Sequence, residues 1–299
     1  KSEVKRSMFA TEDTRYLRFD FLDTSPTGNW PTLLINTTAG LQLIDLENGS
    51  RQTLFEPAQD ISSVKNISAT QSLIGPMGEP AMLIEHPARV SEMSPTPRKR
   101  PLSEFAQTCF SYSSDGRLIA GCDGPSNHTW VADIEFKEVT RLPGSARTVF
   151  VADKINRVFW NDYTQLLSRD LQGSEPIQVL ASFAGVPCCL AMTKDQGKLA
   201  IMLSDREVHL WDAKKNVPIG PIMMHPGSVR LVQFSDDEKT LFTFDQDGTL
   251  RCWNVATGKL TLVVPNPCDE PIALTGISKD GRFHAFVTET NSLHVYRRF

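Results

Sequence analysis

The stretch that decides the fold runs from His225 to Lys259 and reads HPGSVRLVQFSDDEKTLFTFDQDGTLRCWNVATGK. Two short apolar segments, 229–234 and 240–244, are separated by an acidic turn, and an Asp-Gly turn follows at 247–248. Short apolar runs bounded by turn residues predict consecutive antiparallel strands. A third strand then ends at Trp253, and the Ala-Thr-Gly segment after it leads into a fourth.

The same frame recurs along the chain, so the sequence contains an internal repeat. Trp211, Trp253 and Tyr296 mark one equivalent position and lie 42 and 43 residues apart. Further upstream the equivalent strand is followed by aspartates, at Asp170, Asp133 and Asp45. The gap between Asp45 and Asp133 is two periods long, so one degenerate unit must fill about 61–101. Its strands are expected near 71–75 and 81–86.

This pattern resembles the WD-repeat family, whose units of about 40–45 residues each form a four-stranded propeller blade. The resemblance implies an all-β fold, a seven-bladed β-propeller of four-stranded antiparallel blades, in a single domain over residues 1–299. Six blades with a long insertion in 56–103 is the rival count. The predicted blades are 16–55, 61–101, 104–144, 146–180, 186–223, 228–264 and 271–299.

The predicted ring needs a closing strand. Small sheets with apolar faces are not stable alone, so an open ring would expose two such faces. The last unit ends after its third strand, whereas residues 3–9 form an extended-compatible segment ahead of the first unit. As WD-repeat propellers usually close in this way, we expect residues 3–9 to be the outer strand of the final blade.

Several polar residues match a structural network of the WD-repeat pattern. In that family an indole, a hydroxyl, an imidazole and a turn carboxylate form a hydrogen-bonded chain within one blade, which gives each buried polar group a partner. The matching residues here are His225, Thr243, Asp247 and Trp253, and the unit before keeps part of the network in Asp205 and Trp211. The resemblance therefore implies a structural role for these residues.

The sequence contains no recognisable catalytic or metal-binding motif. It has no GxSxG, HExxH, Walker or kinase signature, and its six cysteines and six histidines have no zinc-type spacing. We therefore predict no enzyme activity, no cofactor and no metal site. Unpaired, reduced cysteines favour a cytoplasmic location. Turn chemistry explains the four Asn-x-Ser/Thr motifs, although their use as acceptor sites stays open.

Charge and hydropathy exclude two classes of partner. Lys and Arg total 31 against 35 Asp and Glu, a net charge of -4, so nucleic acid is not expected to bind. No apolar run approaches the roughly 20 residues that cross a bilayer. The chain begins at Lys1 rather than Met, which we interpret as a segment of a longer protein. We expect the domain to be monomeric.

The predicted function is a non-catalytic protein-interaction scaffold, or a sensor or docking domain of a multidomain signalling protein. The joint PIGPIMMHPGSVRLVQF resembles blade joints of bacterial WD-repeat proteins. The alternative is a propeller enzyme, a hydrolase or lyase, with its site in the central channel. The expected partner is a protein or peptide, or another domain of the same chain, of unidentified nature.

WD-repeat relatives bind mainly with the narrower rim, formed by the loops between blades and the turns before each third strand. Trp, Tyr and Arg are also frequent in interface hot spots. Packing between blades is the alternative role for Trp160, and which rim binds stays open. The residues expected to contact a partner are Arg147, Trp160, Asp162, Tyr163, Ser204, Arg206, Gln246 and Asp269.

Deletion of residues 1–10 should sharply lower the melting temperature, because the final blade would lose its outer strand and the ring its closure. Differential scanning calorimetry of the full and shortened chains measures this. An unchanged melting temperature would reject closure by the N-terminal segment.

Overall fold

The computed structural model describes most of the chain and is built from β-strands, with one 3₁₀ turn at Asp153–Ile155. The described residues are 16–22, 30–55, 61–68, 70–76, 80–86, 99–106, 110–123, 128–133, 137–144, 146, 148–162, 164–182, 187–203, 206–266, 270–278 and 280–297. The chain divides into two compact units, the first formed by residues 1–104 with 268–299 and the second by residues 105–267.

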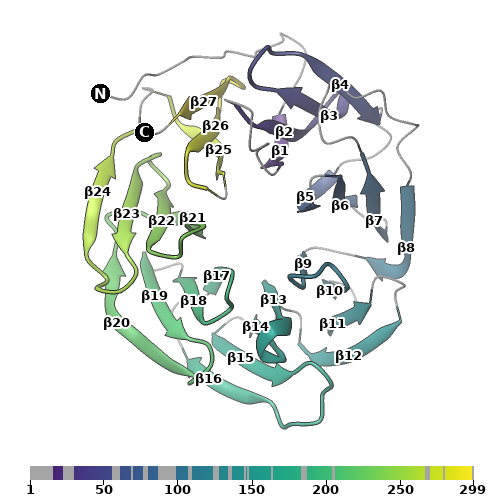
Figure 1. The fold of residues 1–299 in the computed structure, drawn as a ribbon, viewed down its shortest axis with the longest axis vertical. Coiled ribbons are helices and arrows are strands. Elements are labelled where there is room, and N and C mark those ends of the chain that lie inside the picture. Colours follow the sequence, from purple (N-terminus) through teal and green to yellow (C-terminus); the bar gives the residue numbers. More distant parts are fainter. Residues whose placement is uncertain are drawn as a thin grey trace. The chain divides into compact units, whose positions relative to one another are not determined.

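The first unit holds three sheets (Figure 1). The first sheet contains β1 (Tyr16–Phe21), β2 (Thr32–Thr37), β3 (Gly40–Asp45) and β4 (Arg51–Phe55). The second contains β5 (Ile61–Ser68), β6 (Gln71–Pro76), β7 (Pro80–Glu85) and β8 (Lys99–Ala106). The seventh contains β25 (Ile272–Ile277), β26 (Phe283–Thr288) and β27 (Leu293–Arg297).

The second unit holds four sheets of four strands each. The third sheet contains β9 (Phe110–Tyr112), β10 (Leu118–Asp123), β11 (His128–Asp133) and β12 (Glu138–Pro143). The fourth contains β13 (Val149–Ala152), β14 (Arg157–Asp162), β15 (Gln165–Asp170) and β16 (Gln178–Ser182). The fifth contains β17 (Pro187–Met192), β18 (Lys198–Leu203), β19 (Glu207–Asp212) and β20 (Val217–Met224). The sixth contains β21 (Val229–Phe234), β22 (Thr240–Asp245), β23 (Leu250–Asn254) and β24 (Leu260–Val264).

Every sheet is a meander in which chain neighbours are sheet neighbours, as Figure 1 shows for β17 to β20. In the sixth sheet, for example, β22 pairs antiparallel with both β21 and β23. Short turns make this order possible, because antiparallel strands need only a hairpin between them. Each four-stranded sheet therefore forms from one continuous stretch of about 40 residues, the period of the repeat.

The described strands confirm seven sheets, so the rival count of six with an insertion is wrong. The degenerate unit forms a sheet of its own, the second. One boundary differs from expectation, since β8 continues to Ala106 and the third sheet begins only at β9, not at residue 104. The seventh sheet has three strands among the described residues. Residues 3–9, its predicted fourth strand, lie outside them.

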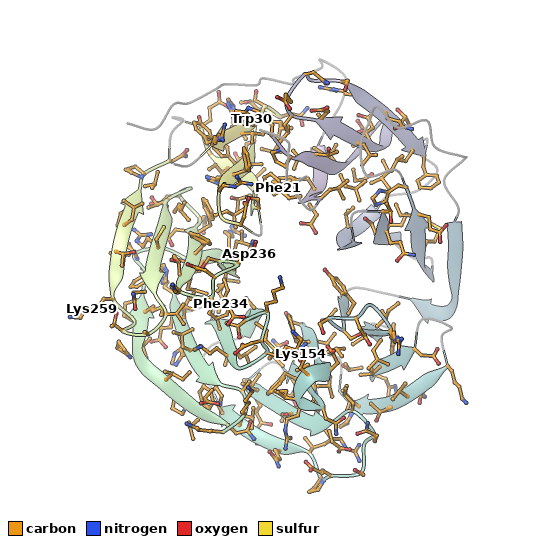
Figure 2. All side chains as sticks on the ribbon, in the orientation of Figure 1. Phe21, Trp30, Lys154, Phe234, Asp236 and Lys259 are labelled. Atoms are coloured by element: carbon orange, nitrogen blue, oxygen red, sulfur yellow. The ribbon has the colours of Figure 1, made fainter. Side chains whose placement is uncertain are left out.

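The core of the first unit lies between consecutive sheets. On β2, Leu33 and Ile35 face the seventh sheet, where they pack with Phe283 and Val295, and Leu34 between them faces the second sheet. This split follows from the two-residue period of a strand, which sends neighbouring side chains to opposite faces. Figure 2 labels Phe21 and Trp30, two further side chains of this packing, and the Trp30 and Phe283 rings lie 5.3 Å apart.

The second unit repeats this arrangement three times. Trp160 and Val158 of β14 pack toward the third sheet, and Phe159 between them packs toward the fifth. The fifth sheet in turn packs against the sixth, which contributes Trp253 and Phe234 to the core between them. Figure 2 labels Phe234. Consecutive sheets thus bury each other's apolar faces, which is the packing that a repeat of small sheets requires.

Replacement of Trp160 by Ala should lower the free energy of unfolding by about 3–5 kcal/mol, because it leaves a large cavity between the third and fourth sheets. Urea denaturation measures the change. Ile177→Ala is the matched control, since that side chain is 36% exposed and its truncation should cost less than about 1 kcal/mol. Equal effects of the two substitutions would contradict this packing.

Candidate functional site

Each sheet of the second unit has two different ends. At the turn end, hairpins join the first strand to the second and the third to the fourth. At the loop end lie the loop from the preceding sheet and the turn between the second and third strands. In the sixth sheet these loop-end segments are 225–228 and 246–249. The residues expected to contact a partner belong to the loop end.

Loop 225–228 holds two of those residues close together. The guanidinium Nη1 of Arg206, in the turn before β19, donates to the carbonyl oxygen of Pro226 at 2.7 Å. The backbone amide of Gln246 donates to the carbonyl of Ser228 at 2.8 Å, and that of His225 to the carbonyl of Arg206 at 3.0 Å. Arg206 and Gln246 are both exposed. Loop 225–228 therefore holds the turn with Arg206 and the turn with Gln246 next to each other. Together these two turns of neighbouring sheets form one polar surface.

Arg206 adopts a strained backbone conformation. Its φ of 76° lies in the left-handed region, which costs a non-glycine residue roughly 1–2 kcal/mol. The two hydrogen bonds between this residue and loop 225–228 offset the cost. These hydrogen bonds hold Arg206 in its strained backbone conformation, so the direction of its side chain is fixed before any partner binds. A side chain that is already oriented suits recognition, because it loses less entropy on binding.

The expectation that Trp160 contacts a partner is wrong. Its side chain is fully buried between the third and fourth sheets, so the alternative role of packing holds. Asp162, two residues later at the end of β14, is half-buried. The other predicted contact residues lie outside the described residues: Arg147, Tyr163, Ser204 and Asp269.

Behind this surface lies the polar network of the sixth sheet. Trp253 Nε1 donates to Thr243 Oγ1 at 2.9 Å, and Thr243 Oγ1 lies 2.8 Å from His225 Nε2. All three residues are buried. These three members were expected from the resemblance to the WD-repeat pattern, in which the matching positions form such a chain.

The last link of the expected network is different. His225 Nδ1 lies 3.0 Å from the backbone carbonyl oxygen of Met223, where a turn carboxylate was expected. Asp247 is exposed and accepts the backbone amide of Thr249 at 2.9 Å. The Asp247 carboxylate thus bonds within its own turn. The acceptor for the His225 ring is instead the Met223 carbonyl in β20, two residues before the histidine.

These contacts decide the protonation of His225. A carbonyl can only accept, so Nδ1 carries a hydrogen, and in the neutral ring Nε2 then accepts from the Thr243 hydroxyl. Burial, followed by the positive charge of Arg251, lowers the pKa of His225 to about 4. Neutral histidine thus lets the bonds run in one direction, from indole to hydroxyl to imidazole to carbonyl.

The fifth sheet lacks this network. The register of its strands puts Ile201 where the sixth sheet has Thr243, so no hydroxyl faces the indole of Trp211. Among the described residues, Trp211 Nε1 has no hydrogen-bond partner. Asp205, its expected companion, lies outside them. Apolar packing of Trp211 against the fourth sheet holds this region together.

Sequence reasoning missed an ion pair beside the network. Arg251 Nη1 contacts Asp245 Oδ2, and the Asp245 side chain is fully buried. The only signal was a cation inside the apolar strand LRCWN. A buried charge of this kind needs a partner, so the pair fixes the end of β22 under the loop-end surface.

The turn end is built differently, from a repeated Ser/Thr-x-Asp turn. Each hydroxyl donates to the aspartate two residues later, and that aspartate accepts the backbone amide two residues beyond it. These bonds lower the pKa of Asp115, for which the Ser113 hydroxyl is the largest cause. The four pairs and their distances are Ser113–Asp115 (2.5 Å), Thr193–Asp195 (2.7 Å), Ser235–Asp237 (2.6 Å) and Ser278–Asp280 (2.5 Å).

Further bonds tie the turns of neighbouring sheets in the second unit. Asp153 accepts from the Ser114 backbone amide at 2.7 Å and from Gln196 Nε2 at 2.8 Å. Burial raises the pKa of Asp153, but these bonds outweigh it and the net shift is downward. Asp195 in turn donates its backbone amide to Glu238 at 2.7 Å. Most of these polar groups at the turn end are thus hydrogen-bonded to other groups of the protein.

Within the described ranges no group of three or more His, Cys, Asp or Glu could hold a metal ion. Cys252, a buried residue of β23, is not part of a disulfide among the described residues. No helix in the described part of the chain is long and apolar enough to cross a membrane.

Comparison with known proteins finds a family match for one part of the chain. Residues 217–254 match the family model "WD domain, G-beta repeat". This part of the chain is similar to one WD repeat. The matched unit begins with β20, the outer strand of the fifth sheet, and continues through β23 of the sixth. One repeat thus straddles two sheets, so the repeat itself connects each sheet to the next.

Two curated relatives show partial similarity to this chain. Apoptotic protease-activating factor 1 of Rattus norvegicus is 28% identical over 118 residues, which are 39% of this chain and 9% of that protein. The same-named protein of Homo sapiens is 32% identical over 69 residues, 23% of this chain and 6% of that protein. The chain thus matches less than a tenth of the length of either relative.

The unfolding free energy should fall as the pH drops from about 6.5 toward 4. Below 6.5 the unfolded chain binds a proton at residue 225, and the folded chain, with its pKa of about 4, does not. The unfolded state is therefore favoured, by up to about 3 kcal/mol, and the loss ends near pH 4. Urea denaturation across this range should show a steeper decline for the wild type than for His225→Gln.

The exposed His128 provides the control for this measurement. His284, whose pKa burial lowers to about 3, contributes equally to the wild type and to both variants. His128→Gln should follow the wild-type curve. Parallel curves for the wild type and His225→Gln would contradict a neutral His225 in the folded protein.

Proposed function

We propose that this chain is a non-catalytic WD-repeat scaffold that binds a protein or peptide, or another domain of its own protein, with its loop end. One observation carries the proposal: Arg206 and Gln246 are exposed on neighbouring sheets and are held by the same loop, 225–228. Preorganised polar and cationic groups suit recognition, because little side-chain entropy is lost on binding.

The contrast between the two ends of the sheets supports this choice. At the turn end, the hydroxyl, carboxylate and amide groups bond to one another within and between turns, as for Ser114 and Asp153. At the loop end of the sixth sheet, the backbone is fixed and the Gln246 side chain is exposed. A partner can use groups that are positioned and still accessible.

We further propose that the seven sheets form one closed propeller, with residues 3–9 as the outer strand of the seventh sheet. The repeat supports this proposal. A small sheet needs a neighbour on each apolar face, and the seventh sheet has three strands among the described residues, one fewer than each of the other sheets.

A propeller enzyme is the less favoured alternative. An active site needs acids and histidines that converge on one pocket with shifted pKa values. For the two described histidines whose pKa values fall most, His225 and His284, burial is the main cause, and no carboxylate is among the causes. We also propose a cytoplasmic location for the scaffold, because the cysteine pattern of the sequence favours reduced thiols.

Affinity capture with the tagged chain tests the function. Arg206→Glu combined with Gln246→Ala should abolish recovery of interactors, because the substitutions reverse a charge and remove an amide on the proposed surface. Arg117→Ala is the matched control, an arginine at the turn end whose side chain is 83% exposed, and should leave recovery unchanged. Interactors that are lost with Arg117→Ala but still recovered with the loop-end variant would reject the assignment of partner binding to the loop end.

A further inference from the structure

The outermost strands of the second unit expose apolar side chains. Apolar residues that are at least 36% exposed gather on or beside β12, β16, β20 and β24, the last strand of each sheet. A single exposed aliphatic residue needs no explanation, but a contiguous apolar group marks a binding surface. These residues are Val139, Ile177, Val179, Val217, Ile222, Met224, Leu260, Leu262 and Val263.

Three of the four edges carry features that discourage pairing with another strand. β12 alternates charges, Glu138 and Arg141, and ends at a proline. β20 contains two prolines, and Gly220, with its φ of 66°, lies between them where the pairing with β19 is irregular. At β16, Asn216 of the next sheet donates to Gln178 at 3.1 Å. Charges, prolines and covering segments are the usual protection of a free sheet edge.

β24 has none of these features. Its sequence, Leu-Thr-Leu-Val-Val, contains no charge, proline or glycine, and the first four residues are exposed. Within the described residues it pairs with β23 alone, so its outer edge presents free backbone amides and carbonyls. An edge that is apolar, regular and open can accept a further strand.

The apolar strip is formed by β24 itself. Leu260, Leu262 and Val263 are between 42% and 45% exposed, and neighbouring side chains of a strand point to opposite faces, so both faces beside this edge are apolar. Ile222 and Met224 of β20 do not extend the strip, because Met223 between them packs against the sixth sheet and they point away from it.

The charge at one end of the strip indicates the chemistry of its occupant. Lys259 precedes β24 directly and is exposed, and Figure 2 shows it pointing outward from the ribbon. Neither β20 nor the segment 259–266 contains an Asp or Glu. An aliphatic segment with acidic residues beside Lys259 would match both the apolar and the charged part of this surface.

We propose that β24 accepts an extended, aliphatic segment of a partner protein as an added antiparallel strand, with acidic residues at the C-terminal end of that segment beside Lys259. Main-chain hydrogen bonds along the edge supply affinity, and alternate side chains packed on the apolar strip supply specificity. The surface is separate from the loop end, so this binding goes beyond the function proposed above.

A synthetic peptide tests the proposal on the full chain. The probe is fluorescein-labelled Val-Thr-Val-Thr-Val-Glu-Glu, and fluorescence anisotropy measures its dissociation constant. Val263→Lys should weaken binding at least about tenfold, because it places a charge in the added sheet. Val139→Lys, on the edge of the third sheet, is the matched control and should change the affinity less than about twofold. Circular dichroism confirms that both variants are folded.

A charge reversal tests the orientation. Lys259→Glu should weaken the acidic probe several-fold and strengthen a second probe that ends in Lys-Lys, and salt should reduce both effects. Unchanged affinities for both probes would overturn the placement of the acidic end. Arg206→Glu should leave probe binding unchanged, so the loop-end function and this site can fail separately.

Three results would overturn the proposal. One is no saturable binding of the probe to the wild type up to about 1 mM. Another is an equal loss of affinity in Val139→Lys and Val263→Lys. The third is a dimer in sedimentation velocity that Val263→Lys abolishes, which would assign the strip to a second copy of the chain.

Discussion

The face-to-face packing of consecutive sheets is the interaction that determines everything else in this structure. A four-stranded sheet of short strands has no interior of its own, so its apolar side chains are buried only by another sheet. On β2, Leu33 faces one neighbour and Leu34 the other, and on β14 the same holds for Trp160 and Phe159. Each strand therefore needs apolar residues on both sides, which is why the repeat contains nearly continuous apolar runs.

This packing leaves polar chemistry to the ends and the outer edges of the sheets. The turn end uses its hydroxyls and carboxylates internally, and Asp153 alone joins the turns of three sheets. The loop end fixes its backbone through loop 225–228 and leaves side chains accessible. Rigidity at one end and positioned, accessible groups at the other are what a docking scaffold requires.

Much of the fold could be predicted because period and turn chemistry are local properties of the sequence. The 42-residue step located even the degenerate second sheet, and the resemblance to the WD-repeat pattern predicted the hydrogen bond between Trp253 and Thr243. The site could be predicted less well. A tryptophan near a strand end has the same sequence pattern whether it is buried or exposed, as for Trp160, and the acceptor for His225 is a backbone carbonyl, which leaves no mark in the sequence.

Nuclear magnetic resonance of the isolated sixth sheet, residues 225–266, is the sharpest test of this dependence on neighbouring sheets. Without the fifth sheet, Val232, Leu241 and Trp253 lose the apolar face against which they pack. We predict the narrow amide dispersion of an unfolded chain for this fragment in water. Wide dispersion with slow amide exchange would show that one sheet folds alone, and that packing between sheets is not what stabilises it.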